Sequence, residues 1–224
     1  MLVAAAVCPC LPSLVLDETD AGAAAAPELL RAACAEAVAT VLAEEPEIMA
    51  VVGPGERSHL HEEGVVWAFR GLGSPVDVRL GRGRATEPPT SRLPMSLGVG
   101  AWLLQQTGWT GPVRAYEVDD DRSWPTNGED GLHTAGWADR VGLLVMGNGP
   151  TRVGADGTRH PDPRAKEIDA GIAAALASGD VDGFFPNLDA GLARDLGVSG
   201  RSPWQLLDEG LGGRRTRRGG TRRR

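Results

Sequence analysis

The opening stretch, LVAAAVCPCLP at residues 2–12, decides the fold of this chain. Seven apolar residues in a row are typical of a strand that is buried on both faces of a parallel sheet. Pro9 and Pro12 end this strand, so we expect Cys10 in a turn at its carboxyl end. Open α/β sheets bind their ligands at that edge. Cys10 is therefore the first candidate site residue.

A second strand of the same kind, IMAVV at residues 48–52, is followed by Gly53, Pro54 and Gly55. Residues 27–43 lie between the two strands and have apolar side chains at helical spacing, which predicts a helix. The strand, helix, strand order predicts a βαβ unit whose strands form a parallel pair. The apolar stripe of the helix comprises Leu29, Leu30, Ala33, Cys34, Ala37, Val38, Val41 and Leu42.

Strands and helices alternate along the rest of the chain. Residues 65–69 and 76–80 predict a hairpin-like pair of short strands, and residues 81–92 an exposed loop. Asp162 is expected to cap a helix. This order predicts one α/β domain over residues 1–212, a three-layer α/β/α sandwich with a mainly parallel central sheet. The other expected strands are 113–118 and 141–146, and the other expected helices are 93–106, 130–139, 163–177, 188–196 and 203–209.

Residues 213–224 form an arginine-rich tail. Seven of the 23 basic residues and no acidic residue lie there, which leaves 16 basic against 30 acidic residues in the rest of the chain. Arginine, glycine and threonine cannot build a core, so we expect the tail to be disordered. A body this acidic repels phosphate backbones. We therefore expect a nucleic acid or an acidic partner only through the tail.

The composition also indicates the compartment. No apolar run approaches the roughly 20 residues that span a bilayer, so we expect no membrane contact. The chain has three cysteines, an odd number, and Cys8 and Cys10 are poorly spaced for a disulfide. The first residues lack the basic segment of a signal peptide. These features favour a cytoplasmic protein.

Metal-ligating residue types follow both strands. A thiolate from Cys10, imidazoles from His59 and His61, and a carboxylate from Glu56 would meet if the two polar clusters lie at one edge of the sheet. Thiolate with imidazole favours zinc or copper over magnesium. Neither Cys-x-Cys nor His-x-His is specific, and a cysteine in an apolar turn is more often a packed hydrophobe. The metal site and a metal-free pocket both stay open; Cys8, Glu62 and Glu63 are alternative ligands.

Other motifs give weaker signals. Glycines at 53, 55, 147 and 149 follow two strands, but neither loop matches a nucleotide-binding fingerprint, and an ordinary turn also needs glycine. The triplet Asp119 to Asp121 is more typical of a solvated turn than of a metal site. No nucleophile elbow is present, so a hydrolase triad has no support.

Taken in order, five segments resemble one family. They are CPCLPSLV at residues 8–15, VVGPG at 51–55, LPMSLGVGAWLL at 93–104, LVMGNG at 144–149 and GRSPW at 200–204. The chain is similar over nearly its whole length before the tail to the class III extradiol ring-cleavage dioxygenases of the B type, and especially to a small actinobacterial branch of that family.

The resemblance implies a non-haem Fe(II) held by two histidines and a carboxylate, a catechol substrate, and a histidine as acid and base. The sequence departs from that pattern at four places. Cys10 and Glu56 stand where ligand histidines are expected, with His59 three residues after Glu56; Met95 and Thr151 stand where the family has histidines further along the chain. These departures remove both the iron ligands and the proton relay that the reaction needs.

The expected function is therefore a dioxygenase-like protein with a degenerate metal site, inactive as a catechol dioxygenase or altered in metal and reaction. One alternative is an active metal-dependent oxygenase on an aromatic diol, with Cys10, Glu56, His59 or His61 as ligands. The other is a non-catalytic scaffold that binds a small molecule or a protein. The resemblance also implies a homo-oligomer.

Overall fold

The computed structural model describes residues 1–16, 25–83, 93–120, 133–134, 136–152, 162–179 and 183–207. Its centre is a five-stranded sheet in the order β1-β7-β2-β6-β3. β1, β7, β2 and β6 are parallel, whereas β3 is antiparallel to β6. The bounds are β1 Leu2–Cys8, β2 Ile48–Gly55, β3 His59–His61, β6 Val113–Asp119 and β7 Val141–Met146.

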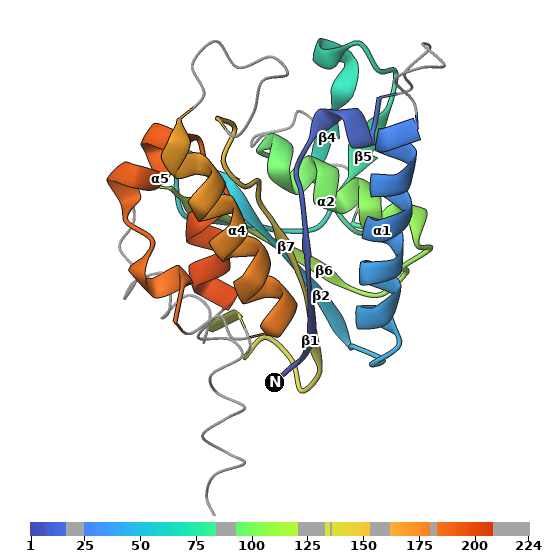
Figure 1. Ribbon diagram of the computed structural model, residues 1–224. Coiled ribbons are helices and arrows are strands. Elements are labelled where there is room, and N and C mark those ends of the chain that lie inside the picture. The colour runs from blue at the N-terminus through green and yellow to red at the C-terminus, as the bar shows by residue number, and fades with distance from the viewer. Residues whose placement is uncertain are drawn as a thin grey trace, which may run out of the picture.

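Helices cover both faces of this sheet (Figure 1). α1 (Ala25–Leu42) and α2 (Met95–Gln106) pack on one face, and α4 (Pro163–Ser178), α5 (Ala190–Leu196) and the helical residues 201–207 pack on the other. Residues of β2 alternate between the two faces of the sheet. Met49 and Val51 pack on the side of α1 and α2, while Ala50 and Val52 pack on the side of α4 and α5. The predicted three-layer α/β/α sandwich with a mainly parallel sheet is confirmed.

The prediction that β1 and β2 pair directly is wrong. They are parallel, but β7 lies between them and pairs with both. β7 reads VGLLVM and is buried at all six positions. A strand without a polar face is most stable in the interior of a sheet, where helices cover both of its sides.

The apolar stripe of α1 is narrower than predicted. Leu29 is 74% exposed, and Ala33, one turn later on the same line of the helix, is exposed as well. Cys34, Val38 and Val41 make the buried contact with the sheet. A helix that packs on a sheet buries one stripe only, so apolar residues on its flank stay in water.

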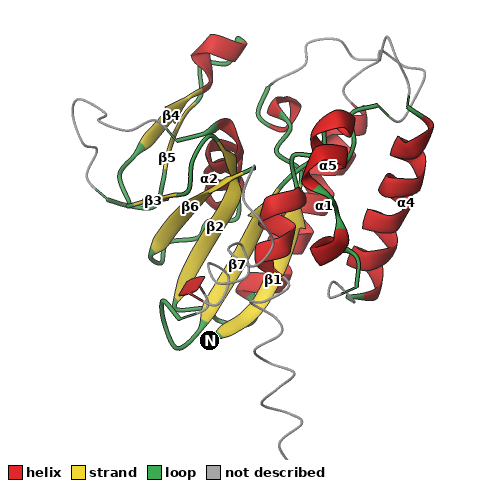
Figure 2. Ribbon diagram, turned by 90° about the vertical axis from the view of Figure 1, so that its left-hand side faces the viewer, coloured by secondary structure: helices red, strands yellow, loops and turns green. Residues whose placement is uncertain are grey.

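The short strand β3 is not predicted, because residues 53–64 are expected to form a loop, whereas the hairpin strands and the cap of α4 agree with the sequence. β4 (Val66–Ala68) and β5 (Asp77–Arg79) form the predicted antiparallel pair, as a separate sheet beyond the β3 edge (Figure 2). Asp162 caps α4 by accepting a hydrogen bond from the Arg164 backbone. Short 3₁₀ turns are η1 (Pro12–Leu14), η2 (Phe69–Leu72) and η3 (Phe185–Asn187).

Several predictions lie partly or wholly outside the described residues. They are most of the loop 81–92, residues 130–132 and 135 of the helix 130–139, the end of the helix 203–209, and the tail 213–224. Within the described part of 130–139, residues 133–134 are helical but residues 136–139 form a turn and bends, so the helix prediction is wrong there. Among the described helices, none is both long enough and apolar enough to cross a bilayer.

Candidate functional site

Three polar residues hold the carboxyl ends of β1 and β7 together. The Cys10 backbone N–H donates to Asn148 Oδ1 at 2.9 Å, and the Asn148 backbone N–H donates to Ser199 Oγ at 3.2 Å. The Gly200 backbone N–H returns a hydrogen bond to the Asn148 carbonyl at 3.0 Å. Asn148 therefore joins the turn after β1 to the segment that follows α5.

Glycine is required where these segments meet. A Cβ atom on Gly147 would lie 2.4 Å from the Gly200 Cα, and one on Gly200 would lie 2.1 Å from the Trp204 ring. The backbones could not approach this closely with any larger residue. The glycines of this loop thus serve close packing, which matches the ordinary-turn interpretation rather than the phosphate cradle.

Cys10 is a packed thiol. It is only 3% exposed, and its side chain forms hydrogen bonds with Ser199 and Asn148. Burial raises its pKa, and the nearby Asp120 carboxylate acts in the same direction. The thiol therefore stays protonated at neutral pH, whereas a metal ligand or a nucleophile has to be the thiolate.

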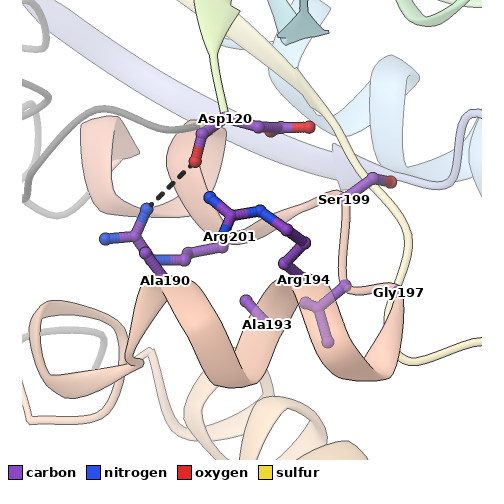
Figure 3. A pocket seen from close by; sticks show the side chains of 8 residues that line it. Asp120, Ala190, Ala193, Arg194, Gly197, Ser199 and Arg201 are labelled. Atoms are coloured by element: carbon purple, nitrogen blue, oxygen red, sulfur yellow. Dashed lines mark hydrogen bonds between the residues drawn. The ribbon is translucent and has the colours of Figure 1, made fainter.

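A pocket of about 220 Å³ lies beside this cluster, between the end of β6 and α5 (Figure 3). Asp120 comes directly after β6, Ala190, Ala193 and Arg194 come from α5, and Ser199 and Arg201 come from the segment that follows. Because β6 is a parallel strand, the pocket is at the carboxyl edge of the sheet, where α/β folds bind ligands. The sequence predicts a site at this edge.

Arginine and aspartate determine the charge of the pocket. Arg201 is 6% exposed; its Nε donates to the Leu188 carbonyl at 2.8 Å, and its Nη1 donates to the Asp120 carbonyl at 3.4 Å. Arg194 is exposed and extends its guanidinium from α5 toward the same region (Figure 3). The described lining residues carry two guanidinium groups and one carboxylate, that of Asp120, in a body with an excess of acidic residues.

A second polar cluster lies at the opposite edge of the sheet. His61 is 1% exposed, and its Nε2 is 3.1 Å from Glu117 Oε2. Glu117 Oε1 accepts the Glu56 backbone N–H at 2.9 Å, and Arg57 Nε is 3.9 Å from Oε2. Burial lowers the pKa of His61, the effect outweighing the hydrogen bond to Glu117 that raises it. The His59 ring packs edge-on against the His61 ring, with 4.7 Å between centroids.

The predicted metal ligands are brought together only in part: His59 and His61 are neighbours on β3, but Cys10 lies at the other edge of the sheet. Cys10 follows β1, whereas His59 and His61 lie on β3, and the four inter-strand steps between these edges correspond to about 19 Å. Glu56 follows β2 in the middle of the sheet and has an exposed side chain. Within the described residues, no group of three or more His, Cys, Asp or Glu side chains could hold a metal ion. The residues that the structure describes therefore do not fit an iron centre of two histidines and a carboxylate.

Sequence reasoning missed most of the residues that line the pocket or hold it together. Asp120 was expected only in a solvated turn, and Asn148 and Arg201 drew attention only as parts of family-like segments. Glu117 was also missed, although an acidic residue at an inward-facing position of a predicted strand is a usable signal. Arg194 and Ser199 carry no such signal, because their position depends on how α5 packs against the end of β6.

Comparisons with known proteins leave the function open. No family model matches the chain, and no curated protein matches it. Among solved structures, an uncharacterized protein from Escherichia coli K12 is similar, with a TM-score of 0.47 and 14% sequence identity over 81% of each chain. A likeness at this level carries no conclusion about activity.

Proposed function

We propose that this chain is a small-molecule-binding protein on a class III extradiol dioxygenase-like scaffold whose iron site is lost. Its ligand is a small molecule with a carboxylate or phosphate group and a hydroxyl or amino group on a neighbouring carbon. It binds in the pocket between the end of β6 and α5, which we call the carboxyl-edge pocket.

The single observation that carries this proposal is the pairing of Arg194 and Arg201 with Asp120 around one pocket. A guanidinium recognises a carboxylate or phosphate through paired N–H donors and remains charged at any physiological pH. The Asp120 carboxylate accepts a hydrogen bond from a hydroxyl or ammonium group of the same ligand. At about 220 Å³ the pocket is below the roughly 300–1,000 Å³ of drug-sized sites, so the ligand is small.

The loss of the iron site is supported by the separation of the candidate ligands. Metal–nitrogen and metal–oxygen bonds are about 2.0–2.2 Å long, so all ligands must converge within one small sphere. Cys10 and the histidines follow strands at opposite edges of the sheet. His61 Nε2 is also engaged by Glu117. We therefore assign these residues to the stability of the two sheet edges.

Calorimetric titration tests the binding proposal. Malate and aspartate supply the oxyanion with a neighbouring donor, succinate lacks the donor, and inorganic phosphate supplies the oxyanion alone. We expect malate or aspartate to bind at one site per chain and succinate to bind more weakly. Arg194→Gln should reduce the affinity at least about tenfold, the scale of one charge-assisted hydrogen bond.

Lys166→Gln is the matched control, because it removes one exposed positive charge on α4 away from the pocket lining. It should leave the affinity unchanged. Equal losses in the two variants, or no binding of any of the four probes, would refute the proposal.

Metal analysis tests the other half of the proposal. Tag-free protein is incubated anaerobically with Fe(II) or Zn(II), desalted and analysed by plasma mass spectrometry. We expect less than about a tenth of an equivalent of metal, unchanged in Cys10→Ser and His59→Ala. Near-stoichiometric metal that falls in either variant would instead establish a rebuilt metal site and revive the oxygenase hypothesis.

A further inference from the structure

A second cavity, of about 260 Å³, lies at the other end of β6. Its walls come from the end of β5, the last turns of α2 and the turn that leads into β6; we call it the α2–β5 cavity. Val113 lines it and begins β6, whereas Asp120 of the carboxyl-edge pocket follows the end of that strand. Seven residue steps along a strand separate the two positions, about 23 Å. The two cavities are therefore distinct.

Among the described residues that line this cavity, the charged groups are cationic: Arg79 and Arg82 line it, and no described acidic residue does. Both arginines are exposed, and within the described residues neither takes part in an ion pair. The carboxylate of neighbouring Glu63 accepts a hydrogen bond from the Val113 backbone N–H through Oε1, at 2.7 Å. Two guanidinium groups without an ion pair among the described residues, on an acidic body, form a local attraction for an anion.

An indole ring forms a fixed wall of the same cavity. Trp109 Nε1 donates to the Pro112 carbonyl at 3.3 Å, and a Cβ atom on Gly111 would lie 2.3 Å from the indole ring. The hydrogen bond and the close glycine contact hold the ring in one orientation. A half-buried indole of this kind offers a flat apolar surface to a planar ligand.

The end of β5, which carries Arg79, is held against α2 by a hydrogen bond. Gln105 Nε2 donates to the Arg79 carbonyl at 2.9 Å, so the end of β5 is tied to α2. This bond fixes the Arg79 backbone relative to the turn that carries Trp109, three residues after the end of α2. A binding site held in place before the ligand arrives loses less entropy on binding.

We propose that the α2–β5 cavity binds a small planar anion, a single ring that carries a carboxylate or phosphate group. The oxyanion pairs with the Arg79 and Arg82 guanidinium groups, and the ring stacks on Trp109. Nothing in this proposal depends on the ligand of the carboxyl-edge pocket.

Titrations of the full chain at low ionic strength test it with four probes. Benzoate and phenyl phosphate are planar anions, cyclohexanecarboxylate has the charge without the flat ring, and inorganic phosphate has no ring. We expect benzoate or phenyl phosphate to bind at least about fivefold more tightly than the two non-planar probes, the scale of one stacking contact. Amide resonances of Gly108 and Gly111 should shift, while those of Gly197 and Ser199 stay in place.

Variants separate the contributions of ring and charge. Trp109→Leu should remove the preference for planar probes, and Trp109→Phe should keep part of it. Arg82→Gln should weaken all anions, while Lys166→Gln, which removes an equal charge elsewhere, should weaken none. Absence of binding, a planar preference that survives Trp109→Leu in a folded variant, or equal losses in Arg82→Gln and Lys166→Gln would overturn the proposal.

Discussion

His61 and Glu117 form a buried pair across the antiparallel edge of the sheet, with 3.1 Å between Nε2 and Oε2. Glu117 is 5% exposed and also accepts the Glu56 backbone N–H, so one carboxylate secures both β3 and the turn after β2. The close packing of Gly55 against this carboxylate, where a Cβ would lie 2.2 Å from Oε1, leaves no room for a larger residue.

Replacing Glu117 by alanine should destabilise the protein substantially. The change leaves the partly buried Glu56 N–H and the buried His61 Nε2 without their acceptor, at a cost on the order of 3 kcal/mol in the free energy of unfolding. Urea unfolding followed by circular dichroism measures this cost. Glu36→Ala, at an exposed site on α1, should stay within about 0.5 kcal/mol of the parent. Similar midpoints for the two variants would contradict the assigned role of Glu117.

The buried His61 predicts loss of stability in acid. Its pKa in the folded protein lies below the ordinary value of 6.5, since burial outweighs the hydrogen bond and charge of Glu117, with His59 and Arg57 adding like charge nearby. Below pH 6.5 the unfolded chain therefore binds a proton at this site that the folded chain does not. The free energy of unfolding is therefore highest above pH 6.5, and it decreases as the pH falls from 6.5 toward the pKa of His61 in the folded protein.

The midpoints of urea unfolding at pH 7.5, 6.5 and 5.5 test whether the stability falls as the pH is lowered. His61→Phe should flatten the decline between pH 6.5 and 5.5, whereas His133→Gln, at an exposed histidine, should preserve it. A decline of the same steepness in His61→Phe would show that other groups cause it.

Gly147 should tolerate no side chain. Alanine there would force the Gly200 backbone away, because the added Cβ would lie 2.4 Å from its Cα. We expect Gly147→Ala to lower the free energy of unfolding by about 2 kcal/mol, within the range for overpacked interiors. Gly71→Ala is the control, since a Cβ at Gly71 meets nothing within 4 Å. Equal thermal stabilities of the two variants would contradict this account.

The sequence predicts the three α/β/α layers better than it predicts which strands are neighbours in the sheet. Apolar runs located β1, β2 and β7, because burial on both faces is a local property of each strand. The position of β7 between β1 and β2 depends on a strand about 90 residues further along the chain, which periodicity does not encode. The same limit explains why the sequence suggested that Cys10 and His59 share a metal site. Both come after buried strands, and only the order of the strands in the sheet shows that they lie at opposite edges.

The cysteines should be protected in the folded protein. Cys8 and Cys34 are 1% and 3% exposed; their mutual hydrogen bond and burial raise the pKa of Cys8, whereas the same bond lowers the pKa of Cys34, so Cys34 is protected by its burial alone. Cys10 is equally buried with a raised pKa. All three thiols should react with a disulfide reagent at least about a hundredfold more slowly in native than in denatured protein. Fast labelling of Cys10 in native protein would contradict its assignment as a packed thiol.

The most direct test of the central claim is a nuclear magnetic resonance titration with malate. If the carboxyl-edge pocket is the ligand site, the amide resonances of Gly197, Val198 and Ser199 should shift and saturate together. In Arg194→Gln, the spectrum should stay that of a folded protein, and saturation should need at least about tenfold more malate. Absence of saturable shifts at these residues, or saturation at the same malate concentration in Arg194→Gln, would contradict the account.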